Sequence, residues 1–203
     1  MRVRGEGPTP CDICVVGEGP GYFEDRLGKP FVGDTGEELE RQLEANGLPV
    51  RRDLFLTNIF REYQGKDYKW TTEDFDRDWP ELVAELQRIR PRLLVTLGRY
   101  ATRAFLGDVD MDGTTGIAWF YPTGLHLELD SFLHDDLVVF PIIHPAAGMH
   151  NPEMSPYVND GFHQLSKYLD GKIQARMLYD DPIKDPEYRL LVGDEVWDIL
   201  KEL

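Results

Sequence analysis

The sequence is poor in cysteine. Cys11 and Cys14 are the only two among 203 residues, too few for the disulfide framework of a small secreted domain. Long apolar runs are also missing, because none approaches the roughly 20 residues that span a bilayer. The N-terminus lacks a signal-peptide pattern. These absences predict an intracellular, cytoplasmic chain with no membrane partner, large enough to fold around its own apolar core.

Two glycine-rich segments near the N-terminus form the strongest local pattern. A short apolar run, Ile13-Cys14-Val15-Val16, is typical of a buried strand and leads into Gly17-Glu18-Gly19-Pro20-Gly21. Gly28-Lys29-Pro30-Phe31-Val32-Gly33 follows shortly afterwards. Glycine lets the backbone turn sharply and brings N–H groups close to a ligand. The pattern therefore predicts either a binding loop at the carboxyl end of a strand, where open α/β sheets place their sites, or an ordinary strand-to-helix turn.

Strand and helix patterns alternate along the rest of the chain, which predicts an α/β fold with three layers, α/β/α, around a mostly parallel sheet. Strands are expected near 12–17, 54–59, 93–97, 117–121, 125–129 and 137–143, and helices near 35–46, 72–89, 99–106 and 156–169. Pro80 predicts a kink or break in the second of these helices. Pro122-Thr123-Gly124 predicts a tight hairpin.

Residues 1–169 are expected to form one domain, followed by an acidic linker and a C-terminal amphipathic helix over 170–203. Asp-Pro pairs in this tail indicate extended or turning chain. Val196, Trp197, Leu200 and Leu203 then recur at helical spacing. The helix is interpreted as docked on the domain itself, as a binding segment for a partner such as a replication or repair protein, or as the start of a second domain.

Four motifs in a fixed order resemble the uracil-DNA glycosylase superfamily, and most closely its family-4 enzymes. The glycine-rich pair is the first, with Glu24-Asp25 between its two halves. The others are Leu56-Thr57-Asn58-Ile59, Ile89-Arg90-Pro91-Arg92-Leu93-Leu94-Val95-Thr96-Leu97-Gly98 and Ile143-His144-Pro145-Ala146. The resemblance covers roughly residues 10 to 169. It implies an enzyme that flips uracil, or a 5-substituted pyrimidine, out of single- or double-stranded DNA and hydrolyses its N-glycosidic bond.

The resemblance also implies site residues. Phe31 would stack on the base, Asn58 would read its polar edge with an amide donor and acceptor, and His144 would donate to uracil O2 as negative charge develops there. Glu18 would orient water or the base, although the position after it, where the best-known family has an aspartate, is Gly19. Glu18 and His144 are thus the catalytic candidates.

The remaining implied contacts concern base choice and DNA entry. The backbone of Gly19 would lie under the base. Gly21 stands where the best-known family has a tyrosine that excludes thymine, and Glu24 is expected to fill that space near C5. Met149 is the large apolar residue in the loop after His144-Pro145 and is expected to wedge into the base stack. Ala146 replaces the serine that usually contacts a phosphate there.

The chain departs from family 4 in its metal site. Most family-4 enzymes hold a four-iron cluster with four cysteines, whereas this chain has two. Cys11 and Cys14 are expected to lie within the first strand with their sulfurs pointing apart. The segment after Asn58, Ile59-Phe60-Arg61-Glu62-Tyr63, has no cysteine, and Asp78-Trp79-Pro80-Glu81-Leu82 stands where the last ligand would be. A four-thiolate cluster is therefore excluded, and neither a metal nor another cofactor is expected.

Positive charge is scarce for a DNA-binding protein. The net charge is −15, and residues 1–169 carry 28 acidic against 17 basic side chains. DNA binders are usually basic where they contact phosphate. A local basic face, a partner that holds the DNA, or life at high salt would each reconcile the charge with DNA binding. Candidates for such a face are Arg51, Arg52, Lys66, Lys69 and Arg103.

We therefore predict a cluster-free, family-4-like DNA glycosylase that acts on DNA at the nucleoid. A non-catalytic module of the same fold, binding DNA or a replication or repair partner, is the alternative. The acidic charge and Ala146 favour the module. The joint presence of Glu18, Phe31, Asn58 and His144 favours the enzyme, because a scaffold does not need all four.

Overall fold

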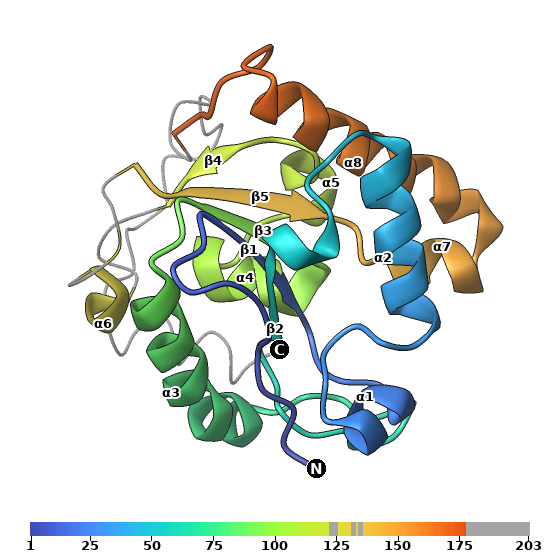
Figure 1. Ribbon diagram of the computed structural model, residues 1–203, viewed down its shortest axis with the longest axis vertical. Helices are drawn as coiled ribbons and strands as arrows, with labels where there is room; N and C mark the ends of the chain where they lie inside the picture. The colour runs from blue at the N-terminus through green and yellow to red at the C-terminus, as the bar shows by residue number, and fades with distance from the viewer. Residues whose placement is uncertain (122–125, 131–132, 134–135, 178–203) are drawn as a thin grey trace.

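The fold is described from a computed structural model that defines residues 1–121, 126–130, 133 and 136–177 (Figure 1). Its centre is a sheet in the order β2-β1-β3-β5-β4. The strands are β1 (Ile13–Gly17), β2 (Phe55–Asn58), β3 (Leu93–Leu97), β4 (Trp119–Phe120) and β5 (Val138–Ile142). Only β4 is antiparallel to its neighbour. The mostly parallel sheet predicted from the sequence is confirmed.

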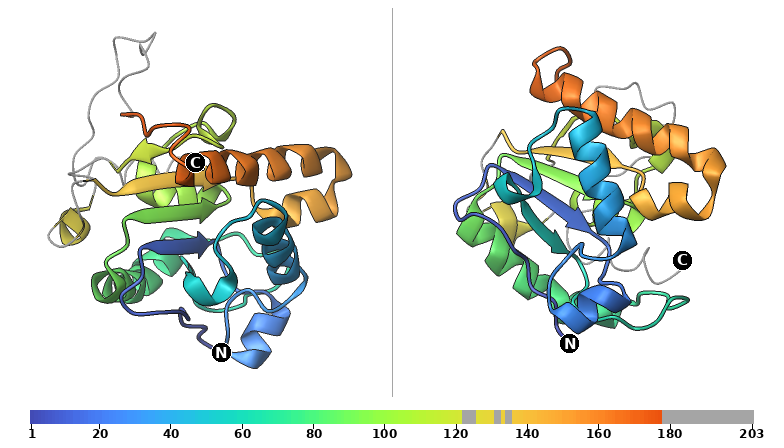
Figure 2. Two further views of the ribbon diagram at one scale, coloured as in Figure 1. Left: turned by 45° about the horizontal axis from the view of Figure 1, so that its top comes forward. Right: turned by 45° about the vertical axis from the view of Figure 1, so that its right-hand side comes forward.

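Helices cover both faces of the sheet. Figure 2 shows α2 (Asp34–Ala45) and α8 (Ser155–Leu169) on one side, joined by α7 (Pro145–His150), and α3 (Thr72–Ile89) and α4 (Arg99–Leu106) on the other. Successive strand residues point to opposite faces, so Val15 packs into the α2/α8 core and Val16 into the α3/α4 core. This is the expected three-layer α/β/α arrangement.

Short helical elements that the periodicity did not predict lie in the connections. They are α1 (Tyr22–Leu27), α5 (Met111–Thr114), α6 (Leu127–Asp130), α7, and the 3₁₀ turns η1 (Arg51–Asp53) and η2 (Pro152–Met154). Each holds six residues or fewer, too few for a helical repeat of apolar positions to be visible in the sequence. Two of them, α1 and α7, directly follow the strands β1 and β5.

The strand expected over 125–129 is wrong. Residues 127–130 form α6, which packs against α3: the Trp79 indole N–H donates to Glu128 Oε1 at 2.7 Å, and the His126 ring lies 4.6 Å from that of Trp79. The sheet edge beside β4 is instead occupied by Arg176, whose backbone pairs with Ala118 and Phe120. The alternation of polar and apolar residues over 125–129 could not show that Arg176, rather than this segment, pairs with the sheet edge.

Of the kink or break expected at Pro80, the break is wrong, because α3 runs through this proline as one helix. The flanking Asp78, Trp79 and Leu82 are buried against the sheet, and tertiary packing of this kind outweighs one lost backbone hydrogen bond. The hairpin predicted at 122–124 and the C-terminal helix predicted within 170–203 lie outside the described residues. No helix among the described residues is long and apolar enough to cross a membrane.

Candidate active site

The predicted site residues converge at one edge of the sheet. Asn58 ends β2, Gly17 ends β1, Gly98 follows β3 and His144 follows β5. These four strands are parallel and adjacent, so their carboxyl ends share one edge. Residues separated by more than 120 positions in the chain are thereby brought to one place.

Gly17 is the point where the implied base-binding side chains meet. A Cβ atom at this position would lie 2.4 Å from Asn58 Oδ1 and 2.7 Å from Phe31 Cζ. Any side chain there would displace the ring or the amide. Glycine thus keeps an aromatic ring and an amide edge side by side, the two surfaces needed to hold a planar base with polar edges. Both side chains are almost fully buried.

The backbone of Phe31 is strained and is held by residues far along the chain. Its φ is 52°, in the region that favours glycine. The Arg51 guanidinium donates to the carbonyls of Phe31 and Pro30, both at 2.6 Å. Gly36 makes room beneath, since a Cβ there would lie 2.0 Å from the Phe31 oxygen. Arg51, expected on a basic face, therefore supports the backbone of Phe31 instead.

Glu24 braces the same loop from the other side. Its carboxylate is buried and accepts the backbone N–H groups of Val32 at 2.9 Å and Gly33 at 2.8 Å. It also fills the space beside Gly21, because a Cβ on that glycine would lie 2.6 Å from Glu24 Oε2. Glu24 therefore both fixes the segment after Phe31 and occupies the position of the missing side chain at residue 21.

Glu18 and His144 both lie next to Gly98. A Cβ at Gly98 would be 2.5 Å from Glu18 Oε1 and 3.2 Å from His144 Cβ. Glu18 also accepts the N–H of Tyr100 at 3.2 Å, so its carboxylate caps the first turn of α4. Burial raises the pKa of Glu18, although the N–H groups of Tyr100 and Arg99 and the charge of Arg99 oppose the rise. Sequence reasoning missed Gly98 as a site residue, although it ends the third motif.

The hydrogen bonding of His144 selects one tautomer. The Ala146 N–H donates to Nδ1 at 3.4 Å, so the neutral ring carries its proton on Nε2. Burial lowers the pKa of His144 to about 4, and the nearby His150 adds to the effect. The imidazole is therefore neutral at pH 7, with Nε2–H available as a donor. The sequence alone could not decide between the neutral and charged rings.

Two further side chains frame the site. Trp70 lies against Gly19, where a Cβ would be 2.4 Å from its ring, and stacks on Phe60 with ring centroids 4.0 Å apart. No pattern in the sequence pointed to this tryptophan, which comes from the loop after β2. Met149 is 43% exposed on α7, the short helix that begins next to His144. Its exposure is compatible with the wedge role expected for it.

The cysteines do not fit an iron–sulfur cluster. Cys11 precedes β1 rather than lying within it, and both cysteines pack into the same core under α3, so the expectation that they point apart is wrong. Burial raises the pKa of the Cys14 thiol well above its ordinary value, which disfavours the thiolate that binds metal. Among the described residues, no group of three or more His, Cys, Asp or Glu side chains is arranged to hold a metal ion.

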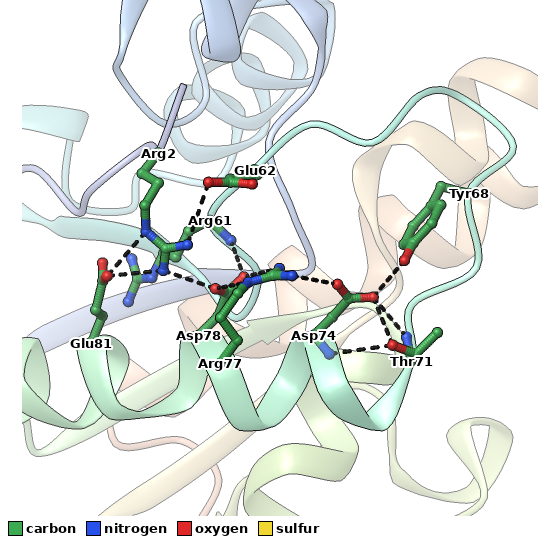
Figure 3. A network of polar contacts seen from close by, with 9 residues as sticks. All are labelled: Arg2, Arg61, Glu62, Tyr68, Thr71, Asp74, Arg77, Asp78 and Glu81. Atoms are coloured by element: carbon green, nitrogen blue, oxygen red, sulfur yellow. Dashed lines mark hydrogen bonds and ion pairs between the residues drawn. The ribbon is translucent and has the colours of Figure 1, made fainter.

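A network of charged groups joins the segments in which the resemblance to family 4 implied the remaining cluster ligands, and it includes Arg61 and Asp78 (Figure 3). Asp78, fully buried on α3, accepts from Arg77 Nε and Arg2 Nη2 at 2.8 Å and from the Arg61 backbone N–H at 2.9 Å. The buried Arg61 guanidinium donates to Thr57 Oγ1, the residue before Asn58, and pairs with Glu85 at 3.0 Å. Through these contacts the N-terminal segment, β2 and α3 are tied together beside the site.

Comparison with known proteins agrees with this geometry. Residues 4–169 match the model of the uracil DNA glycosylase superfamily. The chain is 30% identical to a type-4 uracil-DNA glycosylase of Saccharolobus solfataricus (84% of this chain, 77% of the relative). It is 32% identical to that of Archaeoglobus fulgidus (86% and 85%). It is also 23% identical to a DNA polymerase of Bacillus phage SP01, over 87% of this chain and 18% of the polymerase. The chain therefore belongs to the uracil DNA glycosylase superfamily, a family of glycosylase enzymes.

Proposed function

We propose that this protein excises uracil from DNA by hydrolysing the N-glycosidic bond without a metal ion. The observation that carries the proposal is the convergence of Phe31, Asn58, Glu18 and His144 at one sheet edge, on the glycines that make room for them. Each side chain comes from a different motif, and the fold brings them together. The relatives are named type-4 uracil-DNA glycosylases, and these names indicate uracil as the base that is excised.

The site geometry supports a division of labour. A flipped uracil would stack on Phe31 and present its O4 and N3–H edge to the Asn58 amide. As the bond to the sugar breaks, electrons pass to the base and negative charge grows at O2. A neutral imidazole with its proton on Nε2 can donate a hydrogen bond to that oxygen as the charge develops. Catalysis would then rest on a donor already oriented before the reaction.

In this proposal Glu18 acts on the sugar, whereas His144 acts on the base. The sugar becomes oxocarbenium-like, and water must add to its anomeric carbon. A carboxylate held by the Tyr100 N–H can accept a proton from that water or stabilise the cation. Met149 would fill the gap that the flipped base leaves in the stack. The protein would act on DNA in the cytoplasm, at the nucleoid.

The proposal is tested by uracil release from an oligonucleotide with one uracil, single-stranded or paired with guanine, in the presence of a chelator such as EDTA. Release of free uracil and an alkali-labile site is expected in both, because no step needs a metal. A Phe31→Ala variant serves as a negative control. Failure to release uracil while the DNA is shown to bind would disprove the enzyme, and activity restored only by an added metal would disprove the metal-free mechanism.

Base choice is expected to depend on the bulk of Glu24. Glu24→Ala opens the space beside Gly21, so thymine or 5-hydroxymethyluracil should gain about tenfold or more relative to uracil, the usual worth of a methyl-sized exclusion. Uracil release itself should also fall, since Val32 and Gly33 lose their acceptor. Glu24→Gln keeps the bulk and an accepting oxygen and should preserve the ratio. Equal thymine-to-uracil ratios in both variants would show that selectivity lies elsewhere.

A non-catalytic module is the second candidate, and the similarity to part of a phage DNA polymerase favours it. In that arrangement a glycosylase-like domain would place DNA for a replication or repair partner, through the segment 170–203. Stable binding of uracil-containing DNA without release would support this candidate over the enzyme.

A further inference from the structure

Aromatic side chains gather beside the glycine loop of the site. On α1, directly after the glycine loop, Tyr22 and Phe23 are each 52% exposed, with ring centroids 5.5 Å apart. Tyr63, from the loop after β2, lies edge-on to Tyr22 at 6.3 Å. Figures 1 and 2 both place this loop beside α1. We call Tyr22, Phe23 and Tyr63 the aromatic patch.

The same loop flanks the glycine turn from the other side. Trp70 packs on Gly19, and Tyr68 stands edge-on to Trp70 at 5.3 Å. Tyr68 remains exposed while its hydroxyl is anchored to Asp74 at 2.8 Å. The aromatic rings of this loop and of α1 thus border the one turn that leads into the proposed uracil pocket.

Two exposed lysines of this acidic chain also lie in that region. Of the five basic residues considered in the sequence, Arg51 is bound to the carbonyls under Phe31, Arg103 pairs with Asp108 at 2.7 Å, and Arg52 lies 3.9 Å from Asp53. Lys66 and Lys69 are exposed in the loop after β2 and pair with no acidic group in the described part of the chain. Arg26 adds a cation 5.6 Å from the Tyr22 ring.

We infer that the aromatic patch, with Lys66 and Lys69, binds the nucleotides that flank the uracil in single-stranded DNA. This inference rests on the proposed function, because the pocket beside the patch must hold the uracil. Unpaired bases offer free faces on which exposed rings stack, and nearby lysines track the phosphates. In a duplex those faces are already stacked and paired, so the patch has little to bind. Stacking also supplies affinity that a chain of net charge −15 cannot obtain by long-range attraction.

The test is single-turnover uracil release with enzyme in excess, from an oligonucleotide of about 15 nucleotides, single-stranded or annealed. A Tyr22→Ala/Tyr63→Ala variant should raise the enzyme concentration for half-maximal rate at least about fivefold on the single strand, as loss of a stacked base typically does. The duplex value should change less than twofold, and the maximal rates should stay the same. Tyr22→Phe keeps the ring and should match the unmodified protein.

Two further variants sharpen the result. Leu169→Ala removes an exposed apolar side chain at the far end of α8 and should change neither value. Lys66→Ala/Lys69→Ala should lower the slope of log affinity against log salt by about 1.4 on the single strand, at about 0.7 per phosphate contact. A single-strand loss below fivefold, or an equal loss on the duplex, would overturn the inference. If no substrate releases uracil, the proposed function fails, and anisotropy with a uracil-free strand still tests the patch.

Discussion

Replacing His144 by alanine is expected to lower the single-turnover rate of uracil release by about 10²- to 10³-fold, the usual effect of removing one preoriented donor to a developing anion. The donor is the Nε2–H group of His144. The Ala146 N–H donates to Nδ1, so the proton of the neutral ring lies on Nε2. Single-turnover quench kinetics on a single-stranded uracil oligonucleotide measure this rate. Binding of the same DNA should change little, because the hydrogen bond strengthens only as charge develops on the base.

His163→Ala is the matched control, because His163 is exposed on α8 and takes no part in the site. The pH profile gives a second readout. With the pKa of His144 near 4, the ring stays neutral down to about pH 5, so its contribution should be constant from pH 8 to pH 5. The raised pKa of Glu18 would reduce the rate toward acid as its carboxylate gains a proton. A rate that grows as pH falls through 6 to 7 would instead require an imidazolium and would contradict the neutral donor.

Replacing Asp78 by alanine is expected to destabilise the fold by about 3 kcal/mol, because one partner of a buried charge cluster is removed. The Arg61 N–H loses its acceptor, and Arg77 and Arg2 lose their common anion. For a chain of this size the loss corresponds to a fall in Tm of roughly 6–12 °C. Thermal and urea unfolding measure the two quantities. Because Arg61 bonds to Thr57, beside Asn58, uracil release should fall as well.

Asp136→Ala is the control for Asp78. Its ion pair with Arg92 has a similar length, 3.1 Å, but both side chains are 59% exposed, and such pairs contribute about 0–1 kcal/mol. Burial alone would raise the pKa of Asp78, yet the bonds from Arg77, Arg61 N–H and Arg2 outweigh it and lower the pKa. The stability from Asp78 should therefore be complete above about pH 4, the unfolded value. It should be lost as the pH falls through the lower folded pKa. Equal losses of unfolding free energy in Asp78→Ala and Asp136→Ala would show that the buried network stabilises the fold no more than an exposed ion pair does.

Much of the site was predictable because it lies in short, ordered motifs. Phe31, Asn58 and His144 each lie in or next to a recognisable strand or turn, and parallel strands must bring their carboxyl ends to one edge. The supports were not predictable. Arg51 reaches the Phe31 carbonyl across 20 residues, and Trp70 reaches Gly19 across 51, distances at which sequence patterns carry no information about contact.

The amino-acid sequence by itself determined the layered fold and the identity of the chemical groups, because period-2 and period-3.6 apolar patterns dictate which faces must be buried. Only the tertiary structure decided what those groups do. Burial and one backbone N–H make His144 a neutral donor on Nε2. Hydrogen bonds from two backbone N–H groups show that Glu24 holds the segment after Phe31 in place rather than standing free in solvent. Three arginines around Asp78 make it the centre of a buried charge network rather than a solvated helix acid. Protonation, tautomer and strain depend on the local dielectric and on partners distant in the chain, and these exist only once the chain has folded.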